Sequence, residues 1–152
     1  MKSKKIIIPS TEKELEAYYK LRFEVLRKPW GQVENSTRDE WENISIHVLM
    51  LDENEEAIAA GRLQLTPGNE GQIRSMAVKK EYRGLGLGSE ILLFLEEKAK
   101  EKALTSIVLD ARENAIPFYK KHGYVSTGPS YLLFNEIPHE RMEKILKNKS
   151  ER

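Results

Sequence analysis

The chain of 152 residues has no cysteine. Disulfide bonds, metal sites built on cysteine and a catalytic thiol are therefore excluded. The chain also lacks an excess of either charge, because 25 lysines and arginines almost balance 24 aspartates and glutamates. A net charge of +1 gives no electrostatic reason to expect a nucleic-acid partner.

Long apolar runs are missing as well. The start, Lys2-Ser3-Lys4-Lys5, is basic like the first part of a signal peptide, but only Ile6-Ile7-Ile8 follow before Pro9. That run is too short for a secretory core. No run approaches the about 20 apolar residues that span a bilayer. We therefore expect a cytoplasmic protein with no membrane partner, and the length fits a single domain, residues 1–152.

What the sequence does contain is a glycine-rich turn, Tyr82-Arg83-Gly84-Leu85-Gly86-Leu87-Gly88-Ser89. It lies between a strand-like run, residues 72–78, and a strongly apolar helical run, residues 91–95. A helix that begins here directs its first unpaired N–H groups and its positive dipole end into the turn, which favours a bound phosphate. Arg83 adds a fixed positive charge. A flexible loop is the alternative interpretation, because three glycines alone are a weak motif.

Two common nucleotide-binding motifs do not fit this turn. The dinucleotide fingerprint requires glycine at its sixth position, and counting from Gly84 that position is Ser89. The P-loop requires lysine after its last glycine, whereas Gly88 is followed by Ser89 and Glu90.

Periodicity predicts the order of the remaining elements. After a strand at 6–8, Thr11 or Ser10 caps a helix, with Glu14 as the partner in a capping box, and Pro29 stops it. A polar loop, 30–39, and a short helical turn near 39–43 follow. The predicted strands are 44–51, 57–66 and 72–78 in an antiparallel meander, 105–109 parallel to 72–78 because a helix connects them, and a final hairpin of 124–126 and 131–134 around Gly128-Pro129. The predicted later helices run from the glycine turn to Lys100, over 115–122 and from Pro138 onward.

Two segments resemble the GNAT superfamily of acyl-CoA-dependent N-acyltransferases. The spacing of Arg83, Gly86 and Gly88 is similar to that family's pyrophosphate loop, Arg-x-x-Gly-x-Gly. Ala115-Ile116-Pro117-Phe118-Tyr119-Lys120-Lys121-His122-Gly123-Tyr124 resembles its A-x-x-F/L-Y-x-K-x-G-F/Y segment, and the predicted order of elements matches along most of the chain. More loosely, Ile73-Arg74-Ser75-Met76-Ala77-Val78 and Ile137-Pro138-His139 look like the small bacterial ElaA-like branch.

The resemblance implies an α/β fold of the α+β kind, a mixed, mostly antiparallel sheet flanked by helices, in which a parallel pair of strands splays apart around coenzyme A. It implies an N-acetyltransferase that uses acetyl-CoA as cosubstrate and needs no metal. The primary amine of a small molecule or peptide would attack the thioester directly in a ternary complex. The implied cosubstrate contacts are Met76, Ala77 and Val78 for the pantetheine arm and the backbone of Arg83, Gly84, Leu85, Gly86, Leu87, Gly88 and Ser89 for the pyrophosphate.

Tyr119 occupies the position of the family's usual general acid, whose phenol would protonate the departing CoA thiolate. An unperturbed tyrosine has a pKa of about 10 and is protonated at neutral pH. The alternative is a buried tyrosine that packs its helix on the sheet. Many family members also bind CoA through an asparagine three residues before the motif alanine, where this chain has Arg112. Asn114 either takes over that contact or caps the helix.

The acceptor side is less well defined by the sequence. Some family members deprotonate the amine through a glutamate on the strand before the glycine turn, and Arg74 faces that place here. His47 could act as base, although a lone strand histidine is more often structural. Arg22, Arg62 and Arg74 could bind an anionic group of the substrate or form ion pairs.

Three further expectations remain open at this stage. His122 and His139 are interpreted as a helix-end and a turn residue. The last strands could form the edge of a homodimer. A domain that binds acyl-CoA as a sensor or interaction module, without catalysis, is the alternative function.

Overall fold

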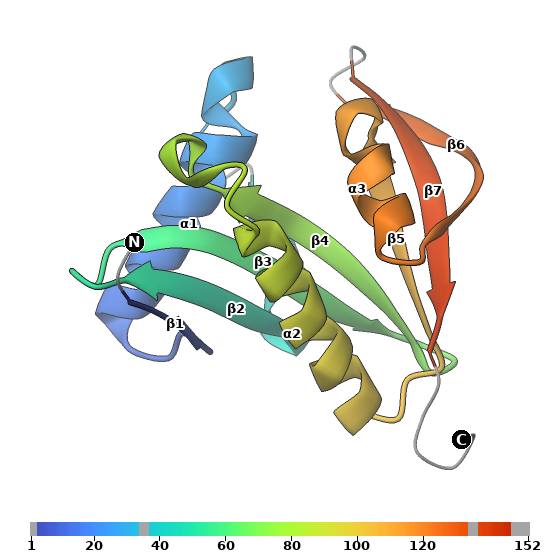
Figure 1. The fold of residues 1–152 in the computed structure, drawn as a ribbon, viewed down its shortest axis with the longest axis horizontal. Coiled ribbons are helices and arrows are strands. Elements are labelled where there is room, and N and C mark those ends of the chain that lie inside the picture. Colours follow the sequence, from blue (N-terminus) through green and yellow to red (C-terminus); the bar gives the residue numbers. More distant parts are fainter. Residues whose placement is uncertain (1–2, 34–36, 134–136, 147–152) are drawn as a thin grey trace.

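The computed structural model describes residues 3–33, 37–133 and 137–146. A seven-stranded sheet forms its centre, with strand order β1-β2-β3-β4-β5-β7-β6 (Figure 1). Only β4 and β5 are parallel, and the other neighbouring strands are antiparallel. The predicted mixed sheet and its parallel pair are thus confirmed. The strands are β1 Lys4–Ile7, β2 Ser45–Asp52, β3 Ala57–Thr66, β4 Glu70–Val78, β5 Ser106–Arg112, β6 Val125–Leu133 and β7 Ile137–Ile145.

Within the described residues the α-helices beside the sheet are α1 Glu12–Leu26, α2 Leu87–Glu101 and α3 Ile116–Lys121. Short 3-10 turns lie between elements, among them η1 Lys28–Trp30, η3 Glu42–Ile44, η4 Lys80–Tyr82 and η5 Glu113–Ala115. The predicted capping box is present at α1, because the N–H of Glu14 donates to Thr11 Oγ1 over 3.1 Å and the N–H of Thr11 donates to Glu14 Oε1 over 3.2 Å. Among the described residues, no helix has the length and apolar character needed to cross a bilayer.

The sheet is buried on both faces by helices, as the alternation within β2 makes clear. Val48 and Met50 join the core under α2, whereas Leu49 and Leu51 pack with α1 on the opposite face. On α2, the fully buried side chains are Leu87, Ile91, Leu92, Leu95 and Ala99. Burial of each large aliphatic side chain stabilises the fold by about 1.5–3 kcal/mol. The helix that follows the glycine turn is therefore anchored firmly on the sheet.

The parallel pair, β4 and β5, is joined only at one end. Glu70–Ile73 pairs with Ser106–Leu109, and beyond Leu109 the residues of β5 pair with β7 alone. On the β4 side the register with β3 shifts near Arg62, and Ser75 takes a left-handed φ of 55° that is uncommon for a residue other than glycine. The two strands therefore diverge, and Figure 1 shows their V-shaped arrangement in green and orange.

The helix predicted from Pro138 onward is wrong, because these residues form β7. The spacing of Met142, Ile145 and Leu146 is helical, but Met142 is fully buried while Ile145 is 68% exposed. β7 lies between β5 and β6 and forms hydrogen bonds with both of them. That long-range pairing outweighs the local pattern.

The hairpin predicted around Gly128-Pro129 is wrong as well. Both residues lie inside β6, where the register against β7 shifts on either side of them. Gly128 has a φ of 132°, so the pair makes an irregularity within a strand rather than a turn between two strands. The predicted loop, 30–39, includes residues 34–36, and the predicted strand, 131–134, includes residue 134. These residues and the tail, 147–152, lie outside the described residues.

Candidate active site

A cavity of about 680 Å³ lies where β4 and β5 diverge. The ends of the two strands, the segment that follows α1 and the region of η5 and α3 form its walls. It is lined by residues that the sequence singled out, namely Arg74, Met76, Val78, Arg83, Asn114 and Tyr119. The fold therefore gathers both sequence motifs around one cavity.

The glycine turn leads from η4 to the start of α2. Gly84 and Gly86 have φ values of 82° and 83°, and a Cβ at either position would meet nothing within 4 Å. Glycine is needed there for the left-handed backbone, and the open space leaves room for a ligand. Gly86 is the N-cap of α2, and no side chain caps this helix end. The first N–H groups of α2 are consequently available to an anion.

The other turn residues differ in how their side chains are placed. Arg83 is exposed, and its Nε donates to the carbonyl oxygen of Val78 over 3.4 Å. Leu85 is exposed, whereas Leu87 is buried in the core and can offer only its backbone. The Ser89 hydroxyl lies 2.9 Å from His122 Nε2. His122 is the residue that ends α3, as the sequence predicted.

The segment of β4 beyond Ile73 has hydrogen-bonded neighbours on one side only. Ala77 and Val78 pair with Ala60 and Ala59 of β3, but no residue of β5 pairs with them. Backbone N–H and C=O groups at this edge can bond an extended ligand such as the amide-containing pantetheine arm. The side chain of Ala77 is buried, while Met76 and Val78 line the cavity.

Tyr119 projects from α3 and lines the cavity with only 7% of its surface exposed. Its ring packs edge-on against Phe118 and Tyr124, with centroids 5.0 and 5.7 Å away. Burial raises the pKa of the Tyr119 hydroxyl, which is therefore protonated at neutral pH. Tyr119 therefore packs its helix on the sheet and also lines the cavity.

Two polar residues lie at the end of β5 and just after it. Arg112 lines the cavity, and its Nη2 donates to the carbonyl oxygen of Leu26 over 3.4 Å. Asn114, in η5, also lines the cavity. The N-cap of α3 is Ala115, without a side-chain cap bond, so Asn114 does not cap that helix.

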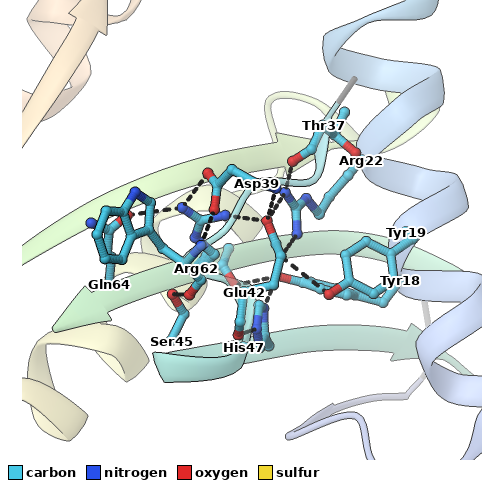
Figure 2. Close-up of polar contacts among 12 residues, drawn as sticks. Tyr18, Tyr19, Arg22, Thr37, Asp39, Glu42, Ser45, His47, Arg62 and Gln64 are labelled. Atoms are coloured by element: carbon cyan, nitrogen blue, oxygen red, sulfur yellow. Dashed lines mark hydrogen bonds and ion pairs between the residues drawn. The ribbon is translucent and has the colours of Figure 1, made fainter. Parts of the chain in front are cut away.

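Beside the cavity lies a group of four charged residues, here called the arginine–carboxylate cluster: the fully buried Arg22 and Arg62, the partly buried Glu42 and the more exposed Asp39 (Figure 2). The Glu42 carboxylate bridges both guanidinium groups, with Arg22 Nη1 2.7 Å from Glu42 Oε1. Arg62 Nη2 also donates to Asp39 Oδ2 over 2.8 Å, and Arg22 donates to the carbonyl oxygen of Thr37. The cluster ties the segment 37–44 to α1 and β3.

The pKa of the Glu42 carboxyl reflects these contacts. Burial alone would raise that pKa, but hydrogen bonds and charge from Arg22, together with the charge of Arg62, hold it below its usual value. Glu42 is therefore ionised at neutral pH and compensates the two buried arginines.

His47 lies beside this cluster and both of its ring nitrogens are occupied. Its Nε2 lies 2.7 Å from the carbonyl oxygen of Glu42, and its Nδ1 lies 2.6 Å from the Tyr18 hydroxyl. Since a carbonyl can only accept, Nε2 donates and Nδ1 accepts from Tyr18. Burial lowers the pKa of His47, which favours the neutral ring.

Of the three predicted acceptor contacts, only Arg74 lines the cavity. Arg22 is fully buried in the cluster, and His47 is held in place by its two hydrogen bonds. Neither is therefore proposed as a substrate contact. The cavity is also lined by four residues that were not predicted as site residues from the sequence: Arg38, Asp39, Asp110 and His139. The prediction that His139 lies in a turn is wrong, because it lies in β7. The signal in the sequence was the spacing of two residues between Ile137 and His139, which places both on the same, buried face of a strand.

Comparison with known proteins supports the sequence resemblance. A family model described as acetyltransferase (GNAT) family matches residues 15–124. "Uncharacterized N-acetyltransferase YjcF" of Bacillus subtilis strain 168 is 34% identical over 140 residues, which span 92% of this chain and 99% of that protein. Two solved structures share the fold. Escherichia coli ElaA has a TM-score of 0.79 at 17% identity, covering 93% of this chain and 98% of ElaA. An aminoglycoside 6'-N-acetyltransferase complexed with coenzyme A has a TM-score of 0.79 at 16% identity, covering 95% and 98%.

Proposed function

Because the chain belongs to the acetyltransferase (GNAT) family and is an N-acetyltransferase, we propose that it transfers the acetyl group of acetyl-CoA to a primary amine of a small molecule or peptide. The amine attacks the thioester directly in a ternary complex. The observation that carries this proposal is the uncapped start of α2 beside the cavity. It directly follows Gly84 and Gly86, whose backbones are left-handed.

In the proposed complex the diphosphate of acetyl-CoA binds the backbone N–H groups between Arg83 and Ser89, and the Arg83 guanidinium adds a charged donor. A solved structure with the same fold, the aminoglycoside acetyltransferase, contains coenzyme A, which supports the choice of ligand. The pantetheine arm then lies along the free edge of β4 from Met76 to Val78, which directs the acetyl group into the cavity.

The reaction needs a neutral amine, an oxyanion site and a proton donor. The amine nitrogen forms a bond to the thioester carbonyl carbon, and a backbone N–H at the free edge of β4 stabilises the oxyanion. Collapse of this intermediate breaks the carbon–sulfur bond and releases the CoA thiolate, which takes the proton of the Tyr119 hydroxyl. The proton lost by the amine passes to water, and the Tyr119 phenolate takes up a proton from water, which restores the acid for the next turnover.

Amine-dependent release of CoA thiol from acetyl-CoA tests this proposal. The purified protein is incubated with acetyl-CoA and a panel of amino acids, amino sugars, polyamines and peptides with free N-termini. The expected result is thiol release that depends on at least one amine and yields its acetylated product by mass spectrometry. Thiol release at the same rate with and without every amine would contradict it.

An acyl-CoA-binding module without catalysis is the second candidate function. The observation that favours it is the absence of an unpaired carboxylate among the described cavity residues. Asp39 is paired with Arg62, and Asp110 is paired with Arg141, so neither is placed as a ready general base. Tight binding of acetyl-CoA without product from any amine would support the module.

Two further features belong to the proposal. The cytoplasm is the proposed location, because proteins of the GNAT family are commonly cytoplasmic. A homodimer through β6 is proposed because β6 is the last strand of the sheet and Val125 on it is 66% exposed. Light scattering after size exclusion tests the dimer, and a monomeric mass would contradict it.

A further inference from the structure

The charges that line the cavity are strongly unequal. Among the residues that the structure describes, two of the lining side chains are acidic, Asp39 and Asp110, and both already form ion pairs with arginines outside the lining set. Figure 2 shows the Asp39 carboxylate turned toward Arg62, 2.8 Å away. Five lining side chains are arginines, namely Arg27, Arg38, Arg74, Arg83 and Arg112. The described part of the cavity lining therefore has an excess of positive charge.

These arginines are not equivalent. Arg83 belongs to the proposed diphosphate site, and the guanidinium groups of Arg27 and Arg112 both donate to the carbonyl oxygen of Leu26 over 3.4 Å. The Arg38 guanidinium lies over the Tyr19 ring, 3.8 Å from its centroid. Each of these four has another interaction that holds it.

Arg74 differs from the other four. Within the described residues it forms no hydrogen bond or ion pair, and it acts on Asp39 through its charge alone. It is exposed on β4 next to Ser75, whose left-handed backbone marks the point where β4 leaves β5. Its planar donor fork is consequently available at the place where the proposed acetyl group and acceptor meet.

This charge distribution decides which amines the cavity favours. A simple amine is an ammonium ion at neutral pH and is repelled by an excess of arginine. A carboxylate or phosphate on the same molecule compensates that charge and can bind a guanidinium through two parallel hydrogen bonds. The same positive field also favours the neutral amine, which is the form that attacks the thioester.

We infer that the acceptor is an amine that also carries an acidic group, a carboxylate or a phosphate, and that Arg74 binds this group. The inference rests on the proposed function and adds the class of its substrate. It also explains how the amine is deprotonated although arginine, and not glutamate, stands at position 74 of β4. The arginines lower the proportion of the ammonium form, and water accepts the proton.

Matched pairs of amines test the inference. The carboxylate arm of the experiment compares tyrosine with tyramine and arginine with agmatine. The phosphate arm of the experiment compares phosphoethanolamine with ethanolamine. CoA release is measured at saturating acetyl-CoA and neutral pH. The expected result is a kcat/KM about tenfold or more higher for the acid-bearing member in at least one arm. The arm that responds identifies the acidic group.

The variant Arg74→Gln separates this contact from general activity. It is expected to raise the KM of the preferred acceptor about tenfold or more and to leave the KM of acetyl-CoA and that of the matched plain amine within about twofold. Arg74→Lys keeps the charge without the fork and is expected to recover part of the loss. Lys13→Gln on α1 removes the same charge from an exposed site outside the cavity lining and is the control, expected to be unchanged.

Three outcomes overturn the inference. Plain amines that react as well as their acid-bearing partners contradict it while leaving the acetyltransferase proposal intact. The same holds if Arg74→Gln weakens both members of a pair equally. Binding of acetyl-CoA without CoA release from any amine overturns the proposed function itself, and the acceptor class falls with it.

Discussion

At the scale of single residues, the proposed role of Tyr119 can be tested most directly. It lines the cavity, its hydroxyl is the proposed proton donor, and burial raises its pKa so that the proton is present at neutral pH. Tyr119→Phe keeps the ring packing and removes only the hydroxyl. We predict a fall in kcat of about 100-fold or more with little change in the KM of acetyl-CoA, measured by steady-state thiol release.

Tyr124→Phe is the matched control for that substitution. The Tyr124 hydroxyl is buried and donates to Glu96 Oε2 over 2.8 Å, but Tyr124 does not line the cavity. The control is expected to lose stability, because the buried Glu96 carboxylate keeps Lys144 but loses one of its two hydrogen-bond donors, and to keep its kcat. Full turnover by Tyr119→Phe would remove the acid role and leave this tyrosine as a packing residue.

The contacts of the arginines on the acceptor side could not be predicted from single residues. Tyr119 and Arg83 were identifiable because each lies inside a local motif with fixed spacing. The engagement of Arg22 and Arg62 with Glu42 was not identifiable, because the partners are separated by 20 residues and meet only in the fold. The sequence alone does not distinguish an arginine that binds substrate from one that is buried in an ion pair.

At the scale of an element, the turn before α2 can be tested by adding one methyl group. Gly86→Ala forces a residue with a Cβ to keep a φ of 83°, which costs about 1–2 kcal/mol of folding free energy. Part of that cost is relieved by distorting the turn, which displaces the N–H groups at the start of α2. We predict a lower Tm together with weaker acetyl-CoA binding, measured by thermal denaturation and calorimetry.

Gly68→Ala separates backbone strain from ligand binding. Gly68 has a φ of 82° and the same open space around its missing Cβ, but it lies in the β3–β4 turn and does not line the cavity. A similar loss of Tm with unchanged acetyl-CoA affinity is expected. Equal weakening of acetyl-CoA binding in both variants would show that the turn before α2 has no special part in it.

The arginine–carboxylate cluster is the element that holds the segment 37–44 against the sheet. Glu42→Gln leaves two fully buried guanidinium groups with one carboxylate fewer, and removal of one partner from a buried ion pair costs about 3 kcal/mol. We predict a destabilisation of that order by urea denaturation at neutral pH. The exposed Glu81→Gln is the control, with little change expected.

The same substitution changes how stability depends on pH. The pKa of Glu42 is lower in the folded chain than its ordinary value, so its stabilisation is full above that ordinary value and is lost as pH falls through the folded pKa. Wild type and Glu42→Gln should therefore converge in stability in the acid range. A constant difference from neutral to strongly acid pH would contradict the ion-pair account.

At the scale of the whole molecule, the topology of the last third is the clearest test of the fold. As a strand, β7 buries Met142 completely and exposes 68% of Ile145; as a helix, the two side chains would share a face. Met142→Ala is therefore predicted to cost about 2–5 kcal/mol of folding free energy, and Ile145→Ala to cost little. Equal losses in denaturant titrations would favour the helix instead.

The elements up to α3 could be predicted and the strands β6 and β7 could not, for a physical reason. Segments 44–78 form a meander of sequential strands, and 91–109 form a helix and the strand it connects, so local periodicity and short connections determine both. β7 inserts between β5 and β6, and its place depends on partners that no local pattern encodes. Two residues of the cavity lining, Asp110 on β5 and His139 on β7, come together through that insertion and were missed with it.

The central claim of this account is that the start of α2 and its glycine turn bind the diphosphate of acetyl-CoA. Calorimetric titration with acetyl-CoA and with S-acetylpantetheine, which has the same thioester arm but no diphosphate, tests it most directly. The account predicts that acetyl-CoA saturates the protein below about 1 mM and that S-acetylpantetheine binds about 100-fold or more weakly. Equal affinity for the two ligands, or no binding of acetyl-CoA at that concentration, would contradict it.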